Sequence, residues 1–158
     1  MKPETGRLIS GPTGQPMIVR IDGDASRGAY SVIEYSHAAG ALGPPAHVHH
    51  HHEEAFYVID GELTLLAGSE SIVLGPGQTA VVPRGIVHQP SNTSDNPVRF
   101  IFISSPPMDE FFIALSKLVA DTNGTPPTTE LTELGERYDS IFVDVAASSS
   151  VRLNNEGG

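Results

Sequence analysis

The sequence predicts an all-β fold, a sandwich or barrel of short strands, followed by one or two C-terminal helices. Its 16 glycines and 13 prolines recur between short apolar runs, which is typical of β-rich chains. After Pro106-Pro107 the apolar residues recur at helical spacing instead. A chain of 158 residues has the size of one domain and can bury its own core.

The expected barrel covers residues 16–106, where apolar runs alternate with turn-forming residues. The expected strands are 17–21, 29–35, 55–59, 62–66, 71–74, 79–82 and 98–103. Asp60-Gly61 is a strong hairpin signal between two of these runs. Short strands at even spacing favour a sandwich or a barrel.

Different structure is expected at the two ends of the chain. Residues 1–15 are rich in Gly, Pro and Thr and are predicted to form a flexible N-terminal arm. Residues 107–145 are predicted to form a helical extension, and 146–158 are small, polar and expected to be disordered. The first helix, over about 108–120, has one apolar face that either packs on the outside of the barrel or covers its mouth as a lid.

Composition limits the classes of function. The chain has no cysteine, so disulfides and thiolate metal sites are excluded. The formal net charge of -10, without a cluster of basic residues, argues against binding to nucleic acid or to a membrane surface. No apolar run approaches the ~20 residues of a membrane helix, and residues 1–10 lack signal-peptide features. A cytoplasmic protein is expected.

Six of the seven histidines fall in two short segments. His47 and His49 are two apart, which puts both imidazoles on one face of a strand. Four residues then allow the chain to cross to the neighbouring antiparallel strand, which Glu54 would open, facing back toward them. The turn at Pro83 to Gly85 would deliver His88 from another strand. Three imidazoles and one carboxylate suit one divalent transition metal ion: Fe, Mn, Ni, Co, Cu or Zn.

These segments resemble the two motifs of the cupin superfamily. The first contains His-x-His, four residues, Glu54, six residues and Gly61. The second contains Gly77, five residues, Pro83-x-Gly85, two residues and His88, then three residues and an asparagine. The resemblance implies a jelly-roll β-barrel, a metal held by His47, His49, Glu54 and His88, and often a homodimer.

A narrower resemblance links the chain to single-domain quercetin dioxygenase-like cupins. It rests on Pro44-Pro45 to Gly61-Glu62-Leu63 and on the tail from Phe111-Phe112 to Tyr138. It implies a dioxygenase that opens a flavonol-like substrate with O2, with Glu54 as ligand and catalytic base. Two alternatives remain open: a non-redox isomerase or polyketide cyclase that uses the metal as a Lewis acid, and a non-catalytic small-molecule-binding protein.

Further residues are assigned by strand parity and position. The substrate pocket is expected to include Phe56, Phe100, Phe102 and Phe112. Glu53 is expected to be solvated, His37 to be an ordinary strand-end residue, and the histidines at 50–52 to form an exposed rim loop.

Overall fold

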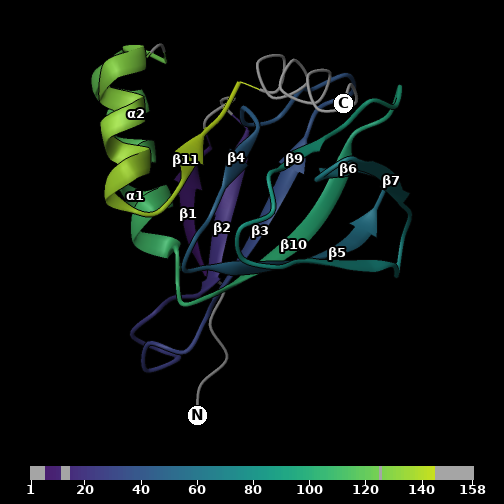
Figure 1. The fold of residues 1–158 in the computed structure, drawn as a ribbon, viewed down its shortest axis with the longest axis horizontal. Helices are drawn as coiled ribbons and strands as arrows, with labels where there is room; N and C mark the ends of the chain where they lie inside the picture. The colour runs from purple at the N-terminus through teal and green to yellow at the C-terminus, as the bar shows by residue number, and fades with distance from the viewer. Residues whose placement is uncertain (1–5, 12–14, 125, 145–158) are drawn as a thin grey trace, which may run out of the picture.

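Two antiparallel sheets face each other, and two helices lie beside them (Figure 1). The structure is a computed structural model that describes residues 6–11, 15–124 and 126–144. The predicted all-β barrel with C-terminal helices is confirmed. Neither helix in this part of the chain is long and apolar enough to cross a membrane.

The larger sheet has six strands and the smaller has five. The larger sheet runs in the order β1 (Arg7–Ser10), β2 (Pro16–Ile21), β3 (Ser31–His37), β10 (Val98–Ser105), β5 (Glu53–Asp60), β8 (Thr79–Val82). The smaller sheet runs in the order β11 (Ile141–Phe142), β4 (His47–Val48), β9 (His88–Ser91), β6 (Leu63–Ala67), β7 (Glu70–Leu74).

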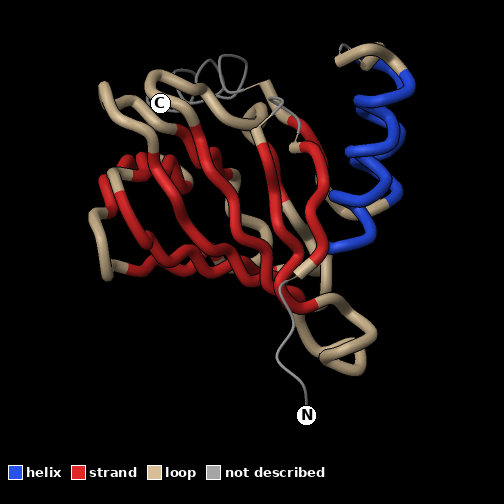
Figure 2. Tube along the Cα trace, turned by 180° about the vertical axis from the view of Figure 1, so that it is seen from behind, coloured by secondary structure: helices blue, strands red, loops and turns tan. Residues whose placement is uncertain are grey.

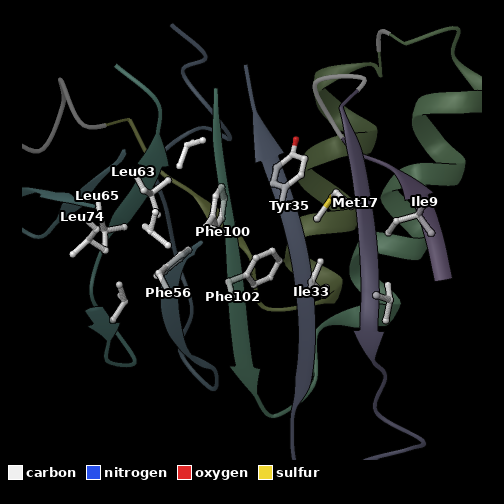
Figure 3. Packing of buried hydrophobic residues seen from close by; sticks show 14 residues of the cluster. Ile9, Met17, Ile33, Tyr35, Phe56, Leu63, Leu65, Leu74, Phe100 and Phe102 are labelled. Carbon is white, nitrogen blue, oxygen red and sulfur yellow. The ribbon is translucent and has the colours of Figure 1, made fainter. Parts of the chain in front are cut away.

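Buried and more exposed residues alternate strictly along the central strands, and the buried ones form the core between the two sheets. On β3 and β10 every second residue is buried, because neighbouring side chains on a strand point to opposite faces. Figure 3 shows Ile33 and Tyr35 on β3 beside Phe100 and Phe102 on β10. Phe56 on β5 packs at ring-centroid distances of 6.3 Å from Phe100 and 6.2 Å from Phe102. The barrel interior is therefore aromatic.

The helices form a second, smaller core at one side of the barrel (Figure 2). Helix α1 (Asp109–Asp121) and helix α2 (Thr128–Arg137) bury a shared apolar cluster that includes Phe111. Phe112 packs against both this cluster and the barrel core, and its ring lies 5.1 Å from that of Phe102. Phe112 therefore connects the C-terminal extension to the barrel core.

The termini differ in part from the sequence-based expectation. Within the expected flexible arm 1–15, Arg7–Ser10 form β1, which pairs with β2 and buries Ile9. Four residues are too short a run to predict a strand from the sequence alone, and it is pairing with β2 that stabilises this one. The expected disordered tail at 146–158 lies outside the described residues.

Candidate metal centre

Three strands from the two sheets bring together His47, His49, Glu54 and His88. His47 and His88 are directly opposite each other on β4 and β9, and His49 follows β4. Glu54 lies on β5, in the other sheet, so the expectation that it opens the hydrogen-bonded neighbour of the His47 strand is wrong. The loop 49–52 instead crosses from one sheet to the other. The side chains of the four candidate ligands are all buried.

The ligand atoms of these four residues all lie within 4.8 Å of one another. Each imidazole uses its Nδ1 to bind a backbone carbonyl: His47 to Pro45 at 2.8 Å, His49 to Asp139 at 2.6 Å and His88 to Ile86 at 3.0 Å. An Nδ1–H donated to a carbonyl leaves the Nε2 lone pair free to bind a metal.

The metal-binding atoms of Glu54 and of two histidines lie close together. Glu54 Oε2 lies 3.2 Å from His88 Nε2, and Glu54 Oε1 lies 3.5 Å from His49 Nε2. His49 Nε2 is buried without a hydrogen-bond partner among the described residues. Buried nitrogens left free in this way fit a bound cation, so the donor set suits a first-row divalent metal.

The electrostatics of the site keep its carboxylate ionised. Burial alone would raise the pKa of the Glu54 carboxyl, but the His49 and His88 imidazoles beside it, when protonated at Nε2 in the absence of a metal, outweigh burial and hold the pKa well below its usual range. Burial and the neighbouring His88 lower the pKa of His47 to about 4. Neutral His47 and anionic Glu54 are the protonation states that a metal requires. Burial alone would lower the pKa of His49, but Glu54 outweighs it and raises that pKa, so a metal bound there would displace a proton.

Asp139, after α2, holds the loop that carries His49. Its carboxylate accepts hydrogen bonds from the backbone N–H groups of His50 at 3.0 Å and His51 at 2.7 Å, and from His52 Nδ1 at 2.8 Å. Its backbone carbonyl binds His49 itself. His50 and His51 are exposed as expected, and His52 is half-buried against Asp139. No sequence signal connects positions 139 and 49, which are 90 residues apart.

A cavity of about 230 Å³ opens onto the metal centre. The expected pocket residues Phe56, Phe100, Phe102 and Phe112 all line it, together with Tyr35, His37, Gly43, Pro44, Pro45, His47, His49, Glu54, Pro90, Met108, Phe111, Leu115, Leu131, Ser140 and Phe142. Both helices and β11 therefore contribute to the wall. No lysine or arginine is among the lining residues.

His37 is not the ordinary strand-end residue expected from the sequence. Its side chain is buried on the inward face of β3 and lines the same cavity. The alternation of β3, which puts His37 on the face of Ile33 and Tyr35, was the signal that could have found it.

Comparison with known proteins supports the class that the fold and site indicate. Residues 34–104 match the cupin domain family. No curated protein matches the chain. The family match and the two antiparallel sheets together show that the fold is a cupin-type jelly-roll barrel with two C-terminal helices.

Several solved structures share this fold at low sequence identity. A sugar phosphate isomerase of the cupin superfamily from Silicibacter pomeroyi has a TM-score of 0.57 and 22% identity, covering 66% of this chain and 75% of that one. An RmlC-like cupin from Shewanella frigidimarina has a TM-score of 0.57 and 20% identity, covering 70% and 93%. The polyketide cyclase RemF from Streptomyces resistomycificus has a TM-score of 0.54 and 18% identity, covering 66% and 77%. At these identities the likeness establishes the fold alone.

Proposed function

We propose that the protein is a metal-dependent enzyme that acts by non-redox, Lewis-acid catalysis on a small, largely apolar substrate that carries a carbonyl or hydroxyl group. The observation that carries this proposal is the pairing of the His47, His49, Glu54, His88 centre with a cavity whose other walls are mostly aromatic and aliphatic. A metal held at this centre polarises a substrate oxygen when bound.

The residues of the chain have separate roles in this proposal. The three Nε2 atoms and Glu54 hold the ion. Glu54 is also the only carboxylate among the cavity-lining residues, so it accepts the proton that the substrate gives up. The aromatic walls exclude water from the reacting centre and align a flat substrate.

The chemistry of the cavity favours an apolar substrate over a phosphorylated one. Arg and Lys side chains are the usual partners of a phosphate group, and the lining residues include neither. The similarity to a sugar phosphate isomerase therefore supports the fold class but not that substrate. A cavity of about 230 Å³ is smaller than the roughly 300–1,000 Å³ of ordinary ligand pockets, which favours a molecule of one or two fused rings.

A dioxygenase of quercetinase type is the second candidate. It is favoured by the donor set, since three histidines and one glutamate leave coordination positions for a substrate and O2 on a six-coordinate metal. No comparison supports a quercetinase specifically. Flavonol as the substrate and the homodimer expected from the motifs both stay predictions.

Dependence on O2 separates the two candidates. Tag-free protein is analysed for bound metal, and metal-loaded and metal-free samples are then screened with acyl phenols, β-polyketones and flavonols, with and without O2. Turnover that needs the metal but not O2 supports the Lewis-acid enzyme. Turnover that stops without O2 contradicts it and supports the dioxygenase. Tight binding with no turnover would indicate the non-catalytic alternative.

A further inference from the structure

His37 carries two buried ring nitrogens that the metal centre does not use. Its side chain is 1% exposed, and neither Nδ1 nor Nε2 has a hydrogen-bond partner among the described residues. The third buried side-chain atom of this kind in that part of the chain is His49 Nε2, at the metal centre. Both histidines line the same cavity. Buried polar atoms are rarely left unpaired in a native structure, so these nitrogens require an explanation.

The position of His37 excludes a role as a metal ligand. The described residues contain two groups of potential metal ligands, the centre already described and a second one of His49, His52 and Asp139, and His37 belongs to neither. Aromatic rings connect it to the metal centre: the centroid of His37 lies 5.2 Å from Phe100, Phe100 lies 6.3 Å from Phe56, and Phe56 lies 6.5 Å from His88. The cavity therefore has a mostly apolar wall, on which His37 lies outside the group of candidate metal ligands.

The packing around His37 fixes the orientation of its ring. Tyr35 and Phe100 contact it edge to face, at centroid distances of 4.7 Å and 5.2 Å. Gly43, with φ +70, comes so close that a Cβ there would lie 3.1 Å from His37 Cε1. Burial lowers the pKa of His37 to about 4, so the imidazole is neutral near pH 7. A neutral imidazole has one N–H donor and one acceptor nitrogen, which together suit a hydroxyl or carbonyl group.

Resting on the proposed function, we propose that His37 is a substrate-binding residue that hydrogen-bonds a second oxygen of the substrate, at a distance from the oxygen that binds the metal. The substrate is then a flat, apolar molecule with two separated oxygen functions. Such a site selects strongly against analogues that lack the second oxygen, because they leave the buried imidazole unpaired.

Naphthols test this inference directly. The Zn(II)-loaded, tag-free protein is titrated with 2-naphthol and with the isomeric naphthalenediols that carry the second hydroxyl on the other ring. Wild type is expected to bind at least one diol about tenfold more tightly than 2-naphthol, which corresponds to one hydrogen bond to a buried partner. His37→Phe keeps the ring shape and removes both nitrogens, so it should bind the diol and 2-naphthol equally. His37→Gln keeps a donor and an acceptor and should retain part of the preference.

Stability and metal content separate this role from a structural one. Replacing an unpaired buried polar group by an apolar one of similar shape should leave the Tm unchanged or raise it. Zinc content and 2-naphthol affinity should stay at the wild-type level in His37→Phe. The inference is overturned if wild type prefers no diol, or if His37→Phe keeps the preference. It is also overturned if His37→Phe unfolds or melts far lower while His37→Gln does not, since the ring nitrogens then have a structural partner.

The same titration distinguishes failure of the proposed function. If 2-naphthol binds equally with and without zinc, the metal does not contact the ligand, and the proposed function is contradicted. The His37 inference is judged instead by the ratio of the diol and 2-naphthol affinities within each variant.

Discussion

Replacing Asp139 by Gly tests whether the segment after α2 positions a metal ligand from outside the coordination shell. Asp139 has φ +60, a left-handed conformation that Gly adopts without strain, so the substitution removes the side chain and leaves the backbone intact. It deletes the three hydrogen bonds to the loop 50–52 and keeps the carbonyl that binds His49. Asp139→Asn keeps the side-chain shape but accepts fewer N–H groups, so it should have an intermediate effect.

The structure allows the size of the effect to be estimated. Hydrogen bonds to a charged acceptor contribute about 1.5–3 kcal/mol each when buried, and less here because His50 and His51 are exposed to water. A total loss of about 2–3 kcal/mol lowers the Tm of a domain of this size by roughly 4–12 °C. A loosened His49 should also lower metal affinity by about 10–100-fold, as is typical when the support of a ligand is removed.

The effect on stability has a defined dependence on pH. Burial alone would raise the pKa of Asp139, but the hydrogen bonds from His52, His51 and His50 lower it from 3.8 to about 2. A carboxyl with a lowered pKa in the folded state stabilises the fold at pH above its unfolded pKa. The free energy of unfolding of wild type should therefore exceed that of Asp139→Asn by its full amount above about pH 5. This difference should be lost as the pH falls from about 4 to 2.

Calorimetry and metal titration of tag-free protein measure these effects. Asp95→Asn is the matched control, because Asp95 is a carboxylate on an exposed loop. A control that loses as much stability would mean that the effect is one of net charge. If Asp139→Gly binds metal as tightly as wild type, the loop holds His49 without the aspartate, and the reasoning is refuted.

Three further predictions concern the ligands, the histidine loop and the helix. His88→Ala should abolish stoichiometric metal in tag-free protein, and metal retained in full would refute the ligand assignment. Replacing the histidines at 50–52 by Ser should leave one tightly bound metal, because their side chains are outside the centre; loss of the metal would show that the ligands are misassigned. Phe111→Ala should cost about 3–4 kcal/mol in the free energy of unfolding, since Phe111 is buried in the helix cluster. Phe112→Ala should cost less and should mainly change naphthol affinity, because Phe112 is half-buried and lines the cavity; a change in stability alone would argue against a lid.

The sequence alone determined the barrel and the composition of the metal centre. The spacing of His47, His49, Glu54 and His88 indicated the donor set, and the structure brings these side chains within 4.8 Å of one another. Strand parity also placed Phe56, Phe100 and Phe102 on inward faces, and they line the cavity. These features are local, since the alternation of side chains on a strand depends only on its own residues.

The tertiary structure decided what lies beside each of these elements. Only the strand order shows that Glu54 comes from the opposite sheet to His47. Only the packing of the C-terminal segment puts Asp139 on the loop that carries His49, across 90 residues of sequence. The same is true of His37, whose burial without a partner depends on rings from other strands. Contacts between distant segments depend on how sheets and helices close on one another, and neither spacing nor alternation along one strand encodes that arrangement.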